Sequence, residues 1–504
     1  MLDNFAFDNE KYIREQTEEI LERVQMFNNK LYLEFGGKLL FDYHASRVLP
    51  GYDPNVKMRL LQQLKDSADI ILCIFAGDIE RRKVRADFGI TYDSDALKII
   101  DDLREWGIEV TAVVITRFDN QPSAVLFKNK LERRNVKVYT HHAIKGYPAD
   151  IDMIVSADGY GKNHYIETTK PLVVVTGPGP GSGKLSTCLS QLFHEHKTGK
   201  NAGYAKFETF PIWNLPLKHP VNIAYEAATA DLRDVNMIDP FHLEAYGKAT
   251  VNYNRDIEIF PVIGRILEAI TDSKVYKSPT DMGVNKAGFA ITDDRIACEA
   301  AKQETIRRFF RYRCEYVMGL TDLETVNRAQ VIMKDLNISE TDRKVVEPAR
   351  RAAEECRAGA KGDNGIFCAA AIELKSGEII SGKNSPQFHA SSSLILNAIK
   401  HLAGIPDKIH LLSPQIIESI NSFKKNILSS KTPNMDLEET LIALCISATT
   451  NPSAQLAMEK LKGLHGCEVH MTHLPTTGDE GGLRRLGVNL TTDPNFASKN
   501  LFLK

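Results

Sequence analysis

The sequence predicts an α/β protein with a doubly wound, mostly parallel sheet, followed by a helical subdomain and a smaller C-terminal α/β domain. Short apolar runs rich in Val and Ile alternate with helical patterns through the first part of the chain, as strands buried on both faces of a parallel sheet do. Three helical patterns then follow without an intervening strand, before strand–helix alternation returns. We place the domains at residues 1–294, 295–360 and 361–504.

The elements of the first domain follow from apolar spacing. An amphipathic helix is expected over 9–28, and two short strands over 31–37 and 38–41 are expected to meet at Gly36–Gly37. A helix led by Pro54 comes next. The remaining expected elements are strands at 70–75, 110–115, 136–139, 151–155 and 172–175, and helices at 95–106, 124–134 and 185–196. Strands joined by helices in this way are expected to lie parallel.

The stretch from Pro171 to Thr187 organises the first domain, because it joins a buried strand to a helix through a glycine-rich loop. Glycine lets backbone N–H groups converge, a helix N-terminus carries partial positive charge, and a lysine adds a full charge. These features predict a P-loop-like site for ATP or another phosphate ligand, with Mg²⁺. Its expected binding residues are Gly177, Gly179, Gly181, Ser182, Gly183, Lys184, Ser186 and Thr187. The alternative is a Gly/Pro-rich turn with a solvated lysine.

The loop departs from the nucleotide-binding pattern GxxxxGK[ST] at two positions. Pro178 stands where the first glycine belongs, and Leu185 replaces the hydroxyl residue that binds Mg²⁺, with Ser186 one position later. Tight binding of Mg·ATP usually needs that hydroxyl. The sequence therefore leaves open whether the loop binds ATP or only phosphate.

Residues 202–285 are expected to form a loop-rich segment that builds a pocket, because polar and aromatic residues are frequent there and apolar periodicity is weak. The candidate catalytic residues are Lys184 for the phosphates, Asp239 with Ser186 for Mg²⁺, and Glu208, His219 and His242 for acid–base chemistry. Asp78 is the second choice for the metal carboxylate. For each of these residues, a capping or packing role is the alternative.

Composition bounds the classes of function. The chain has 63 Lys and Arg against 65 Asp and Glu, so no basic surface for nucleic acid is expected. No apolar run reaches the length of a membrane span, and the first residues lack a signal-peptide pattern. The eight cysteines are scattered without a CxxC pair, which is typical of a reducing compartment. We expect a cytoplasmic protein with a small phosphate-bearing ligand and no nucleic-acid or membrane partner; a homo-oligomer is expected as well.

Helical patterns over 295–312, 323–336 and 343–356 define the helical subdomain, with Ser339 as the expected N-cap of the third helix. The first helix carries four closely spaced arginines, Arg307, Arg308, Arg311 and Arg313. These arginines form either a partner-binding face or, more commonly, a solvated helix face.

The C-terminal domain is expected to open with a hairpin of strands over 367–374 and near Ile379, followed by His389 and a helix over 392–402. This layout is similar to that of cytidine-deaminase-like domains, in which a His-x-Glu motif and a Pro-Cys-x-x-Cys pair hold zinc and move the proton. Ser391 stands at the Glu position, and the sequence has no such cysteine pair. The resemblance therefore implies the fold without zinc and without deaminase chemistry.

Three histidines and Cys467 occur between residues 465 and 473. On an extended strand, Cys467 and His473 share one face and His470 points to the other. This parity favours a strand with polar edge residues over a metal site. A short helix and a terminal strand over 486–490 are expected to follow.

Two phrases beyond the loop carry a wider resemblance. Together, residues 176–187, 204–220 and 239–247 resemble an uncharacterised bacterial family of the DUF1846 type, known as a domain of unknown function, over the full chain. The resemblance implies a bacterial cytoplasmic protein and brings no assigned activity. The loop alone, with Pro178 and Pro180 before Gly-Ser-Gly-Lys, also resembles that of formate–tetrahydrofolate ligases, which bind ATP and activate a carboxylate by phosphorylation.

Two functions remain open at this point. In the first, the protein is an ATP-dependent kinase or ligase acting on a small metabolite, because phosphoryl transfer needs mainly positioning and charge neutralisation. In the second, it is a non-catalytic protein that binds a phosphorylated metabolite or serves assembly. The displaced hydroxyl at Leu185 favours the second function.

Overall fold

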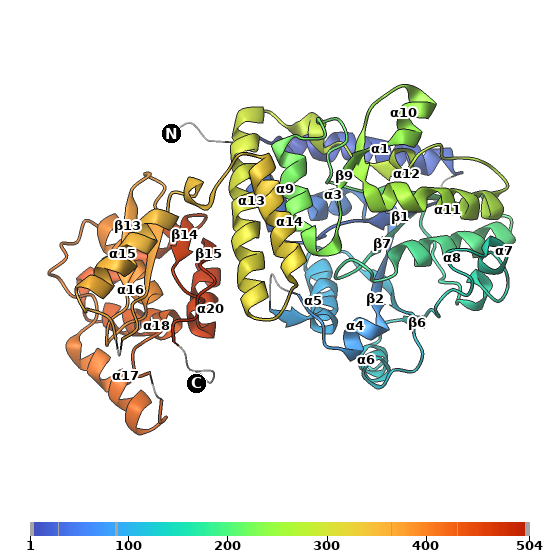
Figure 1. Cartoon of the computed structure of the whole chain (residues 1–504). Coiled ribbons are helices and arrows are strands. Elements are labelled where there is room, and N and C mark those ends of the chain that lie inside the picture. The colour runs from blue at the N-terminus through green and yellow to red at the C-terminus, as the bar shows by residue number, and fades with distance from the viewer. Residues whose placement is uncertain (1–4, 29, 86–88, 364, 431, 499–504) are drawn as a thin grey trace. The chain divides into compact units, whose positions relative to one another are not determined.

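The computed structural model describes residues 5–28, 30–85, 89–363, 365–430 and 432–498 (Figure 1). The chain divides into two compact units, Met1–Ala301 and Lys302–Lys504. The boundary falls inside helix α13 (Asp294–Val317), so the helices expected as a separate subdomain lie mostly in the second unit. None of the helices in the described ranges combines the length and the apolar character that crossing a membrane requires.

Within the described residues, the first unit contains a seven-stranded parallel sheet in the order β11-β8-β1-β7-β2-β5-β6. Its strands are β1 (Leu31–Phe35), β2 (Ala68–Phe75), β5 (Val110–Thr116), β6 (Val138–Thr140), β7 (Leu172–Thr176), β8 (Gly203–Phe207) and β11 (Gly283–Val284). Side chains of β7 alternate between two cores, with Val174 in one and Val175 in the other. The apolar runs of the sequence therefore correctly indicate strands that are covered on both faces.

Helices cover both faces of this sheet. One core includes side chains from α1 (Asn9–Met26), α3 (Val56–Leu64), α5 (Tyr92–Glu105) and α6 (Pro122–Glu132). The other includes side chains from α8 (Lys184–Lys197) and α11 (Asn254–Thr271). The expected α/β class with a parallel sheet between two helical layers is confirmed.

Two expected strands of the first unit are wrong. Residues 151–155 begin with the short helix α7 (Ile151–Ile154), because the Asp150 carboxylate caps its first turn. Residues 38–41 form an irregular segment that leads into α2 (Tyr43–Val48). In both places apolar residues are buried without taking part in a sheet: Ile154 in the first, and Leu39 and Leu40 in the second. Periodicity alone does not distinguish such a segment from a strand.

Residues 202–285 contain more regular structure than the sequence predicts. The segment forms α9 (Pro220–Ala228), α10 (Pro240–Tyr246), α11, α12 (Pro279–Met282) and an antiparallel pair of β9 (Asn236–Ile238) and β10 (Val251–Tyr253). The sequence does not predict α11 because Pro261 lies inside this helix and proline usually ends a helix. Burial of one α11 face, including Phe260 and Leu267, offsets the hydrogen bond that the proline removes.

In the described part of the second unit, four strands form a mixed sheet in the order β13-β12-β14-β15. β12 (Ala369–Glu373) is antiparallel to β13 (Ile379–Lys383) and β14 (Glu468–Met471), and β14 is parallel to β15 (Asn489–Thr492). Helix α15 (Val346–Ala358) packs on one face and α16 (Ala390–Leu402) on the other. The other helices of this unit are α14 (Leu323–Asp335), α17 (Pro414–Asn426), α18 (Leu437–Ala448), α19 (Pro452–Glu459) and α20 (Thr477–Arg485).

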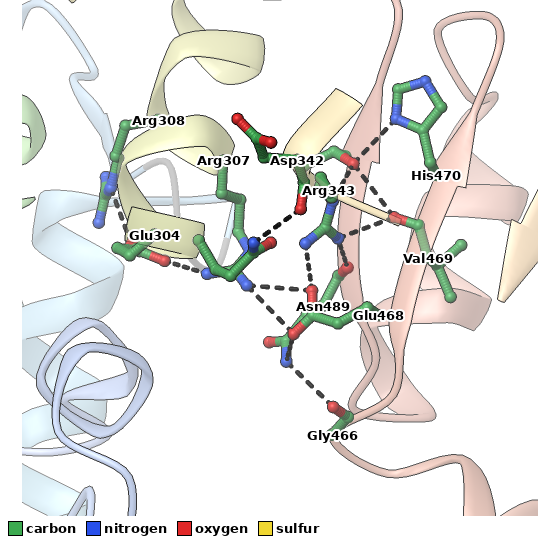
Figure 2. Close-up of polar contacts among 12 residues, drawn as sticks. Glu304, Arg307, Arg308, Asp342, Arg343, Gly466, Glu468, Val469, His470 and Asn489 are labelled. Carbon is green, nitrogen blue, oxygen red and sulfur yellow. Dashed lines mark hydrogen bonds and ion pairs between the residues drawn. The ribbon is translucent and has the colours of Figure 1, made fainter. Parts of the chain in front are cut away.

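A buried arginine holds the parallel strands β14 and β15 of the second unit together (Figure 2). The Arg343 side chain is 1% exposed and forms an ion pair with Glu468. Its guanidinium also donates to the carbonyl oxygens of Val469 and Asn489, at 3.1 and 2.7 Å. One side chain thus satisfies acceptors on both strands.

Two of the four arginines of α13, Arg307 and Arg308, do not form the expected partner-binding or solvated face, because both are largely buried in ion pairs. Arg307 pairs with Glu468 at 3.1 Å and with Glu304, and Arg308 pairs with Glu304 at 3.0 Å (Figure 2). Ser339, expected to cap α15, instead forms a capping box with Asp342 around the short turn that precedes it. The charges of this region therefore satisfy one another within the unit.

Glu468→Gln is expected to destabilise the second unit by about 2–3 kcal/mol, because it leaves the buried Arg343 without a carboxylate partner and Arg307 with Glu304 alone, while Glu468 itself is 28% exposed. Burial raises the pKa of Glu468, but Arg307 and Arg343 lower it to about 2. The stabilisation is therefore complete above the ordinary glutamate pKa and is lost as the pH falls toward 2. Urea unfolding followed by circular dichroism, with hydrogen exchange of β14 and β15, measures both effects.

Glu480→Gln provides the control, because Glu480 forms an exposed pair with Arg484 on α20. Its cost is expected to stay below about 0.5 kcal/mol. Equal destabilisation by the two substitutions would contradict the role assigned to Arg343 and Glu468.

Candidate functional site

The Gly-rich loop lies at the carboxyl edge of the parallel sheet, between β7 and α8. β7 is adjacent to β2, and the chain leaves the two strands in opposite directions, from β7 to β8 and from β2 to β5. Adjacent strands whose connections diverge form a switch point, where α/β sheets bind ligands. The connections from β8 to β11 and from β1 to β2 also diverge, so the β8–β1 edge is a second switch point.

Close packing of the loop against two neighbouring strands requires glycine. A Cβ atom on Gly177 would lie 2.4 Å from the carbonyl oxygen of Cys73 in β2. A Cβ atom on Gly183 would lie 2.7 Å from the Thr116 side chain of β5, and Gly183 has a φ of +92°, which other residues rarely adopt. The Thr116 hydroxyl donates to the Ser182 carbonyl at 2.7 Å. The loop is therefore fixed to β2 and β5.

Unpaired backbone donors mark the start of α8. Among the described residues, the N–H groups of residues 181–186 have no hydrogen-bond acceptor within the protein. The helical ladder starts with the Thr187 amide, which donates to the Gly183 carbonyl at 3.0 Å. A helix of 14 residues carries partial positive charge at this end. Free amides and the helix dipole together favour an oxyanion.

Two cationic side chains extend along the same loop. The Lys184 ammonium lies 3.3 Å from the Gly179 carbonyl oxygen. The Arg117 guanidinium donates to the Gly181 carbonyl at 2.5 Å and lies 3.4 Å from the centre of the Phe75 ring. Within the described residues neither cation pairs with a carboxylate. Both charges therefore remain available to a ligand.

Asp78 brings a carboxylate to the end of β2, the strand next to β7. It lies in the first turn of α4 (Ala76–Glu80), is 2% exposed and pairs with Arg81. Burial lowers the pKa of Arg117, Asp78 opposes this shift and Arg81 adds to it, so these groups share one electrostatic environment. With Lys184, the charged groups at this end of the loop are Arg81, Arg117 and Asp78.

The hydroxyl residues after Lys184 differ in accessibility. Thr187 is fully buried and accepts a hydrogen bond from the Cys73 thiol at 3.4 Å, so its hydroxyl faces the core. Ser186 is partly exposed, and Leu185 packs partly against the core between α8 and the sheet. Ser186 is therefore the more accessible of the two hydroxyls and Thr187 contributes to packing; the assignment of Ser186 to Mg²⁺ stays a prediction.

Asp239 and His242 lie together in the α10–α12 region. Asp239 is fully buried, accepts from the His242 amide at 3.1 Å as the N-cap of α10, and accepts from the Thr280 hydroxyl at 2.6 Å. The His242 ring lies 2.9 Å from the Ser278 hydroxyl. In the described ranges no hydrogen bond or ion pair joins either residue to the Gly-rich loop. Both carboxylate oxygens of Asp239 are used within the protein, and its assignment to Mg²⁺ stays a prediction.

His219 forms a cluster with Asp294 and Cys298 whose potential ligand atoms lie within 4.8 Å of one another. Its Nδ1 accepts from the Val221 amide at 3.3 Å as the N-cap of α9, and its Nε2 lies 2.9 Å from Asp294. A neutral imidazole that accepts at Nδ1 carries its proton at Nε2, where it donates to Asp294. This tautomer leaves no ring lone pair for a metal ion, so the geometry favours a cap between α9 and α13.

Glu208 follows β8 at the second switch point and is 6% exposed. Its carboxylate lies 2.6 Å from the Lys206 ammonium, which also pairs with Asp256 at the start of α11. Burial raises the pKa of Glu208; Lys206 opposes the shift, Asp256 and Glu34 add to it, and the result is about 7. Among the acid–base candidates, Glu208 is the one that the structure places at the same sheet edge as the loop.

Three residues of these two switch points do not emerge from the sequence reasoning. Arg117 follows the apolar run of β5 directly, and a search for charges at expected strand ends would have found it. Glu34 and Lys206 lie inside β1 and β8. A polar residue within an apolar run does not indicate which strand will pair with its own, or which side chains will lie beside it. Glu34 and Lys206 lie side by side because β1 and β8 are neighbouring strands, and local sequence patterns do not predict strand order.

A unit with a parallel sheet covered by helices, followed by a unit with a mixed sheet, defines a two-unit α/β protein. The chain belongs to the DUF1846 family. Residues 5–337 match the "Domain of unknown function DUF1846, N-terminal" and residues 341–502 match its C-terminal counterpart. The resemblance stated from the sequence is therefore confirmed.

The chain is also similar to bacterial proteins described as "UPF0371 protein". It is 57% identical over 498 residues to one from Clostridium tetani (strain Massachusetts / E88), 58% to one from Clostridium botulinum (strain Kyoto / Type A2), and 56% to one from Clostridium botulinum (strain Eklund 17B / Type B). Each alignment covers 99% of both chains. The similarity thus extends over nearly the whole length of these relatives.

Gly183→Ala is expected to destabilise the first unit by about 2–4 kcal/mol, because it combines a positive φ with contact to Thr116. Gly181→Ala is the matched control. It also has a positive φ, but nothing lies within 4 Å of its Cβ position, so a cost of about 1–2 kcal/mol is expected. Urea unfolding followed by the fluorescence of Trp106 and Trp213, both in the first unit, measures the difference. Equal costs would show that the loop does not pack against β5.

Proposed function

We propose that the Gly-rich loop is P-loop-like and binds the phosphate groups of a nucleotide, and that the protein transfers phosphate from Mg·ATP to a small metabolite. The observation that carries this proposal is the unpaired run of amides at residues 181–186, flanked by the cations Lys184 and Arg117. Backbone donors and uncompensated positive charge at a helix N-terminus suit a phosphate group more than any neutral ligand.

In this proposal the loop amides and Lys184 hold the terminal phosphates, and Arg117 neutralises charge on the transferred group. Preorganised donors of this kind account for most of the catalysis of phosphoryl transfer. Ser186 and Asp78 supply oxygen ligands for Mg²⁺ from α8 and from the end of the adjacent β2. Asp78 replaces Asp239 as the first choice, because it follows the strand next to the loop.

A second function is favoured by one observation. Leu185 occupies the position of the metal-binding hydroxyl, and Thr187 is buried, so that of Ser186 and Thr187 only Ser186 is accessible to a ligand. A site of this kind also suits a protein that binds a phosphorylated metabolite without metal and without catalysis.

Thermal unfolding of the full-length protein with ATP, ADP or inorganic phosphate, each with and without Mg²⁺, tests the proposal. We expect Mg·ATP to raise the melting temperature, because a ligand of the folded state stabilises it. Lys184→Ala and Arg117→Ala are each expected to weaken Mg·ATP binding about tenfold or more, because each removes a charge-assisted contact to phosphate. Lys197→Ala, at the opposite end of α8, is the matched control and is expected to bind normally.

The outcomes of this experiment separate the two functions. An unchanged shift in Lys184→Ala contradicts the site assignment altogether. A shift with phosphate that is indifferent to Mg²⁺ supports the non-catalytic function. Asp78→Asn is expected to remove the Mg²⁺ dependence of the thermal shift. Asp239→Asn is expected to lower the melting temperature and to leave that Mg²⁺ dependence unchanged, because the Asp239 carboxylate caps α10.

We further propose that the second unit is a cytidine-deaminase-like fold that has lost its zinc chemistry. The strand hairpin leads to His389 at the N-cap of α16, and the His389 ring lies 2.8 Å from Asp479. Ser391, at the position of the proton-transferring Glu, donates to the same carboxylate at 2.5 Å. The expected result of metal analysis on the purified protein is no stoichiometric zinc, and zinc that is lost in His389→Ala would contradict the proposal.

A further inference from the structure

Glu208 and the Gly-rich loop lie at neighbouring positions along one sheet edge. In the strand register, Glu34 of β1 pairs with Val175 of β7 on one side and with Lys206 of β8 on the other. Two residues beyond this row, the chain reaches Gly177 in the loop and Glu208 after β8. Adjacent strands are about 4.8 Å apart, so the two positions are separated by about 10 Å. A small molecule can span that distance.

The polar side chains at β1 and β8 also share the sheet face that α8 covers. Tyr32 and Tyr204 belong to the core beneath α8. Because side chains alternate along a strand, Glu34 and Lys206 lie on that same face. Burial raises the pKa of the Cys188 thiol on α8, Glu34 raises it further, and Lys184 opposes the shift. Glu34 and Lys184 therefore both lie near the first turns of α8.

The β8–β1 edge carries the opposite charge from the loop. Three carboxylates, Glu34, Glu208 and Asp256, surround the single ammonium of Lys206 in the described residues. The Tyr204 hydroxyl donates to Glu34 at 2.8 Å. Binding of a phosphate group is thus favoured at the loop. At the β8–β1 edge, phosphate and any other anion are disfavoured.

Glu208 is the carboxylate of this group that is poised between its two protonation states. Burial, opposed by Lys206, raises its pKa to about 7. In the described ranges, its Oε1 accepts from Lys206 and its Oε2 has no donor. The titratable groups that face it are Lys206 on β8, Asp256 on α11, Glu34 on β1, Tyr225 on α9 and Tyr253 on β10.

We propose that Glu208 is the proton acceptor of the transfer reaction and that the phosphate acceptor is a small hydroxyl compound, neutral or cationic, such as a polyol or an amino alcohol. The inference rests on the proposed function of the loop. The hydroxyl oxygen bonds to the γ-phosphorus, the bond from that phosphorus to the β,γ-bridging oxygen breaks, and ADP leaves. The hydroxyl proton passes to Glu208, which later releases it to solvent.

The same charges argue against a carboxylate acceptor, which the resemblance of the loop to ligases would imply. A carboxylate nucleophile has no proton to surrender, so a base gives it no advantage. It would also approach three carboxylates balanced by one lysine. The geometry therefore favours a kinase over a ligase.

Release of ADP by the full-length protein with Mg·ATP tests the inference, with sorbitol, ethanolamine and succinate as acceptor probes. We expect sorbitol or ethanolamine to accelerate ADP release, succinate to have no effect, and the rate to rise as the pH passes through about 7. Glu208→Gln is expected to lower the accelerated rate about 100-fold and to remove the pH-dependent rise. Glu22→Gln, on the exposed side of α1, is the matched control and is expected to behave as the wild type.

The thermal shift with Mg·ATP distinguishes this inference from the function on which it rests. If the wild type shows no shift, the proposed function fails. If the wild type shows the shift, three outcomes overturn the inference and leave the proposed nucleotide binding intact. These are a wild-type rate in Glu208→Gln, acceleration of ADP release by succinate alone, and no acceleration by any of the probes. Should Glu208→Gln not fold, Glu208→Asp keeps the carboxylate and is expected to retain the pH-dependent rise at a reduced rate; its loss would overturn the inference.

Discussion

The close approach of Gly177 and Gly183 to the ends of β2 and β5 is the constraint on which the candidate site depends. A side chain at either position would collide with the Cys73 carbonyl or with Thr116. Because the loop is held in this position, α8 begins directly at the sheet edge with its first amides unpaired. The site is therefore a consequence of backbone packing, to which Lys184 and Arg117 add charge.

Charge along the carboxyl edge of the parallel sheet is divided between its two switch points. Cations gather where the loop meets β2 and β5, and carboxylates gather where β1 meets β8. Strand spacing fixes the separation of the two groups. In the proposed reaction, this division of charge would bind the phosphate donor at the loop and a neutral or cationic acceptor beside it.

In the second unit, by contrast, a carboxylate of the protein itself, that of Asp479, binds at the starts of three helices. Asp479 accepts from the Leu437 amide at the start of α18, from the Ser391 hydroxyl in the first turn of α16, and from the Thr476 hydroxyl that precedes α20. Burial raises the pKa of Asp479, but His389 and these hydroxyls lower it to about 2. An internal anion fills this position, whereas the amides of the Gly-rich loop have no such partner among the described residues.

The sequence by itself determined strands β1, β2, β5, β6 and β7 of the parallel sheet, the Gly-rich loop and the opening hairpin of the second unit, because each is encoded by local apolar runs or turn residues. It also supplied Lys184, Ser186 and Glu208 as candidates. It did not predict β8 and β11, which lie in the segment expected to be loop-rich. Helix α11 escaped detection because burial overrides the local effect of Pro261. Tertiary structure alone decided that Asp78 lies beside the loop while Asp239 caps α10, and that Glu34, Lys206 and Asp256 gather around Glu208. The physical reason is that strand order and register join residues distant in the chain, and no local pattern records which strands become neighbours.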